Sequence, residues 1–265
     1  MRKAALALCL LVLAAAAPKP KPPPAASPPA ASATDIAEQL TMLAFDANPL
    51  WSIPPRTVLS RWAGPMRLFV FGRPEDRADA KAVARSLSRP TGLSIRVVTE
   101  REIIRARPNA FLVADENLAG AFSGPLRAML ANAFLDDEAA VEQFITEVIA
   151  TTPCWTLPVW TDATRLVLKA TVIGIDITQP RERTRGCIIR TLGAAIGLLG
   201  PGAYLPASAF APNGPSILSR DDDRMLRTLY GRALRPGMTR DESQEAARTA
   251  LTTPSRNVAK PKLLR

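Results

Sequence analysis

The chain has 265 residues, of which 47% are hydrophobic, so it can bury a sizeable core and is not wholly disordered. Its 34 basic and 24 acidic residues give a net charge of +10, but eight of the basic residues lie in residues 1–33 or after Pro254, where there are no acids. The remaining 26 basic and 24 acidic residues nearly balance, so we expect no nucleic-acid partner. The chain has no histidine, which excludes metal sites and catalytic pairs that need one.

The first 17 residues have the pattern of a secretory signal peptide. Arg2 and Lys3 precede an apolar run from Ala4 to Ala17, which is shorter than the roughly 20 residues of a membrane-spanning helix. We therefore expect a periplasmic or extracellular protein whose mature form has no transmembrane segment. The alternative is an uncleaved leader that anchors the chain to the membrane.

Residues 18–33 are rich in Pro, Ala and Ser, which predicts an extended linker. Residues 34–253 predict a single domain, and residues 254–265 predict a basic flexible tail. The first element of the domain is an amphipathic helix over Thr34–Phe45, because Ile36, Leu40 and Leu43 recur at helical spacing.

A strand, a helix and two more strands are predicted next. The strands are short β-branched or aromatic runs, and the helix begins at a proline, which is favoured in a first turn. These elements cover Arg67–Phe71, Pro74–Leu87, Leu93–Thr99 and Ala110–Asp115.

The second half begins with an apolar stripe that predicts a helix over Asp136–Ile149. A strand within Arg165–Asp176 then leads to the helix-like run GCIIRTLGAAIGLLG at Gly186–Gly200. Two capping boxes, Ser219 with Asp222 and Thr239 with Glu242, predict two C-terminal helices. The whole pattern indicates an α+β domain in which helices pack on a small mixed sheet.

Two cysteines, Cys154 and Cys187, follow the leader. An even number of cysteines in an exported chain favours a disulfide. The alternatives are two buried thiols, or a metal site for which two thiolates supply only half of a tetrahedral set.

The chain resembles an exported bacterial family known as domain of unknown function 2927. The resemblance rests on RWAGPMRLFVFG, the helix of Cys187, PSIL at 215–218 and LYGRALRPGM at 229–238, and it covers about Arg61–Ala247. The family looks distantly like zincin metallopeptidases, whose catalytic helix follows an edge strand. The resemblance therefore implies a zincin-like sheet and a helix that starts near Gly186.

The polar residues of the family's helix are replaced in this chain. The family reads Cys-x-x-Glu-Glu-x-x-Gln there, and the positions of the two Glu and the Gln hold Arg190, Thr191 and Ala194. The family's Ser-Ile-Phe-Asn-Asp is likewise replaced by SILSR at 216–220. Because an arginine cannot act as a base or hold a metal-bound water, this helix is not expected to catalyse hydrolysis, and we expect no metal or cofactor.

Two charged clusters are further candidate sites. Arg181, Arg183, Arg185 and Arg190 surround the helix start with only Glu182 nearby in sequence, which would suit an anion, although a solvated loop is the simpler interpretation. Asp221–Asp223 could bind a hard cation, but acids in a first turn are expected from helix electrostatics alone.

Three functions remain open at this point. The leading hypothesis is an exported, non-catalytic, zincin-like domain that acts by binding or as a structural part of the envelope, with an envelope protein or polymer as partner. The second is a peptide or glycan hydrolase that uses other carboxylates, such as Asp176 or Glu182. The third is a binder of anionic polymer or lipid through the basic ends.

Overall fold

The structure is a computed structural model that describes residues 31–134, 137–160, 165–202, 204–205 and 207–253. The predicted signal peptide, all but the last three residues of the predicted linker, and the predicted tail lie outside the described residues. None of the described helices is long and apolar enough to cross a membrane.

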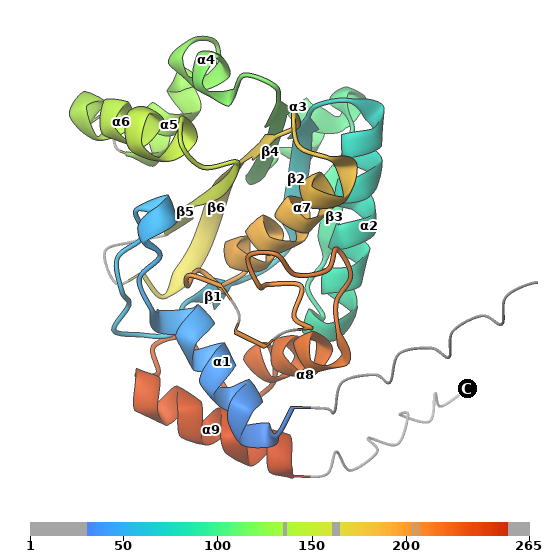
Figure 1. Cartoon of the computed structure of the whole chain (residues 1–265), viewed down its shortest axis with the longest axis vertical. Helices are drawn as coiled ribbons and strands as arrows, with labels where there is room; N and C mark the ends of the chain where they lie inside the picture. Colours follow the sequence, from blue (N-terminus) through green and yellow to red (C-terminus); the bar gives the residue numbers. More distant parts are fainter. Residues whose placement is uncertain (1–30, 135–136, 161–164, 203, 206, 254–265) are drawn as a thin grey trace, which may run out of the picture.

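One mixed sheet runs through the centre of the molecule (Figure 1). Its strands are β1 (Arg61–Trp62), β2 (Met66–Phe71), β3 (Ile95–Val98), β4 (Ala110–Asp115), β5 (Cys154–Trp160) and β6 (Val167–Asp176). β2 pairs in parallel with β3 and β4, and β6 pairs in parallel with β4 and β1. β5 alone is antiparallel, and it pairs with the other side of β6.

The four predicted strands are confirmed, but β1 and β5 were not predicted from the sequence. β5 contains Pro158, and a proline within an apolar run argues against a strand because it has no N–H to donate. The position of β5 explains the exception: it pairs with β6 alone among the described strands, and an edge strand tolerates a proline.

The helices surround this sheet in three groups. They are α1 (Ala33–Phe45), η1 (Pro49–Trp51), α2 (Pro74–Thr91), η2 (Glu100–Glu102), α3 (Ile103–Ala106), α4 (Leu118–Ser123), α5 (Arg127–Ala133), α6 (Glu138–Phe144), the π-helical turn η3 (Ile145–Ile149), α7 (Arg181–Ala195), α8 (Arg220–Leu229) and α9 (Arg240–Thr252). In Figure 1, α1, α8 and α9 gather at one end and α4, α5 and α6 at the other, while α2 and α7 lie along the sheet.

The alternation of strand side chains divides the core in two. Leu68, Leu112 and Ile173 belong to a cluster that includes side chains of α1, α2, α7 and α8. Trp155 belongs to the second cluster, with side chains of α4, α5 and α6. The ring centroids of Phe122 and Phe144 lie 5.1 and 5.2 Å from that of Trp155, so this indole forms the centre of the second cluster.

The bounds of several predicted helices need correction, and α2 runs to Thr91, four residues past its predicted end at Leu87. α1 begins one residue before the predicted Thr34 because Ser32 and Asp35 form a capping box: Asp35 N–H donates to Ser32 Oγ at 3.1 Å. The predicted helix over Asp136–Ile149 is α6 followed by the π-helical turn η3, and it is capped by Asp137, whose Oδ1 accepts from Ala140 N–H. The capping boxes of Ser219 and Thr239 are confirmed.

The C-terminal string at 229–238 holds the strand β1 and the end of α7 together. The Tyr230 hydroxyl donates to the Ile196 carbonyl at 2.7 Å and accepts from Trp62 N–H at 3.2 Å. Leu59 N–H donates to the Met238 carbonyl at 2.7 Å, and Gly237 N–H donates back to the Leu59 carbonyl at 3.0 Å. These contacts give the string a structural role.

Asp222 fixes the loop that follows α7. Its carboxylate is buried and accepts from Ser208 Oγ at 2.5 Å, Ala209 N–H at 2.9 Å and Ser219 N–H at 2.9 Å. The Asp221–Asp223 cluster is thus used for capping and loop anchoring. Asp223, the residue after Asp222, makes an i,i+4 ion pair with Arg227.

We predict that Asp222→Asn destabilises the protein far more than Asp223→Asn. The amide that replaces the Asp222 carboxylate would lose charge-assisted hydrogen bonds in a buried position, so the free energy of unfolding should fall by about 2 kcal/mol or more. Loss of the ion pair of Asp223 should cost under about 1 kcal/mol. Urea denaturation of both variants measures the difference, and equal losses would contradict this role for Asp222.

Candidate functional site

The helix α7 follows β6 after a four-residue connection, which confirms the predicted strand-to-helix order. The helix starts at Arg181, five residues before the expected start at Gly186, because the charged stretch 181–185 forms its first turn behind Pro180. The resemblance also implied an edge strand directly before this helix. That detail is wrong here, because β6 is paired on both sides and the edge strand is β5.

A disulfide between Cys154 and Cys187 joins β5 to α7. Their Cα atoms are 5.7 Å apart, and both side chains are buried. The Trp51 indole N–H donates to the Cys154 carbonyl at 2.8 Å, which attaches η1 to the same point. The start of the edge strand is therefore fixed from two directions.

Arg190 lies over this disulfide. Its Nη2 is 3.4 Å from the Sγ of Cys187 and 3.5 Å from the Sγ of Cys154. The side chain is half-buried, and burial lowers the pKa of its guanidinium from the ordinary value, although an arginine stays charged at neutral pH. No acid of the described residues forms an ion pair with it.

The other two substituted positions of the helix belong to the core. Thr191 is fully buried, and its hydroxyl donates to the Cys187 carbonyl at 2.8 Å. Ala194 is also fully buried, in the cluster of Trp155. Of the three substituted positions, Arg190 lines two cavities, whereas Thr191 and Ala194 are fully buried.

The structure divides the predicted arginine cluster into two pairs. Arg181 and Arg185 reach Asp79 of α2, with Nε to Oδ distances of 3.2 and 3.4 Å. Arg183 and Arg190 instead line a groove beside the start of α7. Asp79 lies 102 residues from Arg181, so sequence proximity could not reveal that two of the four arginines share an acidic partner.

The groove has a volume of about 540 Å³. One wall is the start of α7 with Gly186, Cys187 and Arg190, and the facing wall is the loop 212–215 that Asp222 anchors through Ser208. Gly186 leaves room for the Arg190 guanidinium, because a Cβ at position 186 would lie 3.2 Å from it. A smaller, more apolar hollow of about 170 Å³, lined by Trp51, Phe210 and Cys154, lies on the other side of Arg190.

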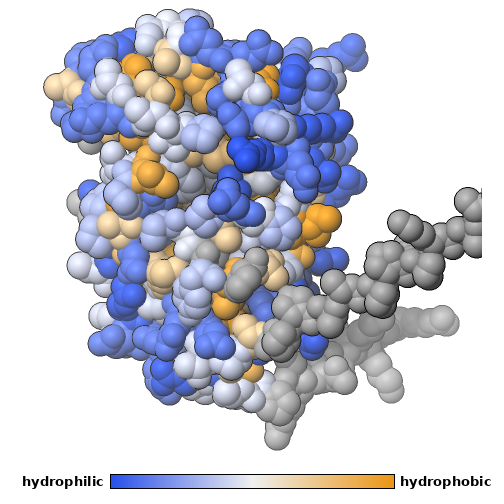
Figure 2. All heavy atoms as spheres, in the orientation of Figure 1, coloured by the Kyte–Doolittle hydropathy of each residue, from blue (hydrophilic) through white to orange (hydrophobic). Residues whose placement is uncertain are grey.

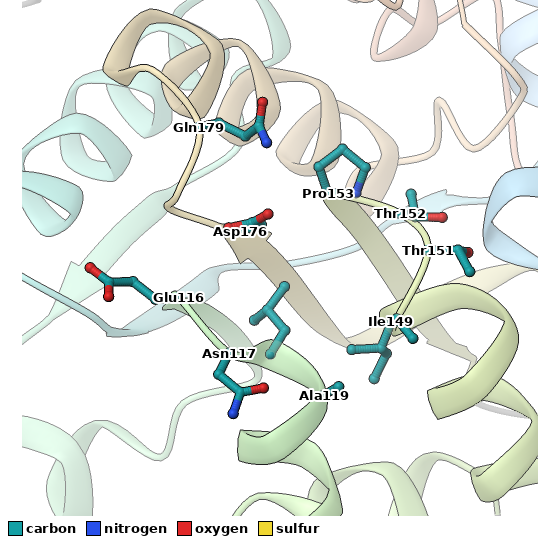
Figure 3. Close-up of a pocket in the computed structure, with 11 residues that line it drawn as sticks. Glu116, Asn117, Ala119, Ile149, Thr151, Thr152, Pro153, Asp176 and Gln179 are labelled. Atoms are coloured by element: carbon teal, nitrogen blue, oxygen red, sulfur yellow. The ribbon is translucent and has the colours of Figure 1, made fainter.

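A third hollow of about 360 Å³ lies where the parallel strands β4 and β6 end (Figure 3). It shares Pro153 and Gln179 with the groove, so the two adjoin. In Figure 3 the Asp176 carboxylate points between Gln179 and Pro153, whereas the Glu116 carboxylate points away from the other labelled side chains. Asp176 Oδ1 also accepts from Thr178 N–H at 2.8 Å.

The candidate residues from the sequence fall in different places. Asp176 lines the hollow at the strand ends, and Glu182 lines the groove with Arg183. Among the described residues no group of three or more Cys, Asp or Glu side chains could hold a metal ion. Figure 2 shows a mostly hydrophilic face with separate small apolar spots.

Tryptophans often line ligand grooves or anchor a core, and the structure separates the four of this chain. Trp62 and Trp155 are core residues, and Trp160 is half-buried with the Arg165 guanidinium 5.3 Å from its ring centroid. Trp51 is buried, yet it lines the smaller hollow. The role of Trp51 was missed because nothing in the local sequence places η1 beside Cys154.

The described part of the chain is thus a mixed α/β domain whose edge strand is joined by a disulfide to the helix that walls a groove. The chain belongs to the family described as "Protein of unknown function (DUF2927)", whose profile matches residues 34–249. The match extends the resemblance of the motifs, which began at about Arg61, to include α1. No curated protein and no solved structure matches the chain.

We predict that removal of the disulfide with the double variant Cys154→Ala/Cys187→Ala lowers the free energy of unfolding by about 3 to 4 kcal/mol. The bond closes a loop over a sequence separation of 33 residues, and this is the stabilisation that lost chain entropy predicts for that length. Urea denaturation measures it. A loss of under about 1 kcal/mol would show that α7 and β5 hold each other without the bond.

Proposed function

We propose that this chain is an exported, non-catalytic, zincin-like domain that binds a carboxylate-bearing ligand of the cell envelope in the groove beside α7. The observation that carries the proposal is Arg190. It stands where the family has a glutamate, it lines the groove, and no acid of the described residues pairs with it.

The chemistry of the groove favours binding over hydrolysis. A hydrolase needs a positioned base or a metal-held water, and Arg190 can supply neither. The neighbouring position, Thr191, uses its hydroxyl within the helix and is fully buried. Without both carboxylates, the helix presents the Arg190 guanidinium to the groove instead of a catalytic acid or base.

The charge of the groove fits one carboxylate. Arg183 and Arg190 contribute two positive charges and Glu182 one negative charge, so the lining has a net charge of +1. The first turn of α7, which lies in the same wall, has no side-chain cap and adds the partial positive charge of a helix N-terminus. A planar guanidinium also matches the geometry of a carboxylate.

The arrangement of elements supports the zincin-like part of the proposal in outline. An antiparallel strand, β5, borders a sheet that is otherwise parallel, and the next strand leads directly into the helix that walls the groove. Export is supported by the leader pattern and agrees with the disulfide, since such bonds persist in oxidising compartments.

We predict that the protein binds the peptide acetyl-Ala-Ala-Ala with a free carboxylate and does not bind its C-terminal amide. Amide chemical shifts of Gly186 and Cys187 should move on titration with the acid alone. Arg190→Met should weaken binding at least about tenfold, because one charge-assisted contact is worth about 1.5 kcal/mol or more.

Arg185→Met is the matched control, because Arg185 belongs to the same helix but pairs with Asp79. It should change the affinity less than about twofold. The loss of one contact worth about 1.4 kcal/mol would instead change it about tenfold. Equal binding of acid and amide, or unchanged binding by Arg190→Met, would contradict the proposal. Inorganic phosphate serves as a second probe, and tighter binding of phosphate than of the acid would overturn the assignment of a carboxylate.

A hydrolase is the second candidate, and Asp176 is the observation that favours it. This carboxylate points into a hollow at the carboxyl ends of two parallel strands, where ligands of α/β proteins commonly bind. Glu116, the other acid of that hollow, points away from it, so the hollow offers one carboxylate where acid and base catalysis uses two groups.

The two candidates differ in what Asp176→Asn and Glu182→Gln should do. Under the binding proposal these carboxylates take no part in turnover. Neither variant should therefore change the rate at which product forms from peptide or glycan substrates. Loss of measurable turnover in either variant, with an unchanged unfolding midpoint, would establish the hydrolase instead.

A further inference from the structure

The sulfur atoms of the disulfide lie between two cavities. Cys187 lines the groove of about 540 Å³, and Cys154 lines the apolar hollow of about 170 Å³. Both side chains are more than nine-tenths buried overall, yet each forms part of a cavity wall. A small molecule in the groove would therefore meet the Cys187 side of the bond.

A cation touches both sulfur atoms. Arg190 Nη2 lies 3.4 Å from one Sγ and 3.5 Å from the other, and no acid of the described residues competes for it. A guanidinium at this distance favours a thiolate over a thiol. A thiol of lower pKa is also a better leaving group in thiol–disulfide exchange.

We infer that the Cys154–Cys187 disulfide is a thiol-exchange site, with Arg190 as the residue that stabilises the leaving thiolate. An external thiolate enters the groove and attacks Cys187 Sγ. The bond between the two protein sulfurs breaks as the new bond to Cys187 forms, and the electron pair leaves on Cys154 Sγ beside the guanidinium. One thiolate is consumed and one is formed, so the step needs no oxidant or reductant.

The exchange partner is a small thiol or an accessible cysteine of another chain, since both carry the same reacting atom. This inference concerns the sulfur atoms and does not rest on carboxylate binding. It assigns a second consequence to the substitution at position 190: where the family carries a glutamate, which would disfavour a neighbouring thiolate, this chain carries a cation.

The test uses the folded, disulfide-bonded protein and 2-mercaptoethanol, whose thiolate has no other charged group. Acid quenching followed by intact-mass and peptide mass spectrometry measures the rate and position of mixed-disulfide formation. We expect the adduct on Cys187. We expect its rate to fall about tenfold in Arg190→Met, because the leaving thiolate loses its cation.

Arg183→Met is the matched control, because Arg183 lines the same groove without a contact to either sulfur. Its rate should fall much less than that of Arg190→Met, because only the attraction of the incoming thiolate is weakened and the leaving thiolate keeps its cation. The adduct on Cys154, an equal rate in Arg190→Met, or a faster one would overturn the inference, and the faster rate would identify Arg190 as a steric shield.

A second measurement covers the case in which Arg190→Met alters the fold. In Cys187→Ser the remaining Cys154 thiol can be titrated through its alkylation rate, and we expect its pKa to lie below the ordinary value of about 8.5. Arg190→Lys in the same background should keep it low. A pKa at or above the ordinary value would contradict a stabilised thiolate.

Discussion

The pairing of β6 on both of its sides is the constraint on which the site depends. On one side β6 pairs in parallel with β4 over Ala110–Asp115, and on the other it pairs antiparallel with β5. Because only four residues separate the end of β6 from the start of α7, the sheet fixes where the helix starts. The Cys154–Cys187 bond then joins the outermost strand to the same helix, so the α7 wall of the groove is tied to the sheet.

Some of the family's sequence motifs stabilise this arrangement of the sheet and α7, and others face the groove. Tyr230 and Met238 belong to the first kind, since they connect the end of α7 and the segment before β1. Position 190 belongs to the second kind. Under the proposed function, the arginine at this position gives the groove a group that can bind an anion but cannot transfer a proton.

The sequence predicted well those features that depend on neighbours along the chain. The helix over Pro74–Leu87, the strand at Ala110–Asp115 and the capping boxes of Ser219 and Thr239 follow local periodicity and side-chain chemistry, and the structure confirms them. The pairing of the two cysteines was also predictable, because they are the only two cysteines after the predicted leader.

The features that were not predicted from the sequence depend on contacts between residues far apart in the chain. β5 was missed because Pro158 hides the strand pattern, and only its place at the edge of the sheet explains it. The neutralisation of Arg181 depends on Asp79, 102 residues away. The contact of Arg190 with both sulfurs requires the helix, the strand and the disulfide together, so no local pattern could have indicated it.

The central proposal is that α7 has the position of a zincin catalytic helix but lacks the residues that hydrolysis needs. Elemental mass spectrometry of the mature protein, purified without a polyhistidine tag, tests it most directly. The account predicts a folded protein with no stoichiometric metal. Zinc at close to one equivalent would contradict it, because the protein would then have Asp, Glu or Cys ligands that hold a catalytic water.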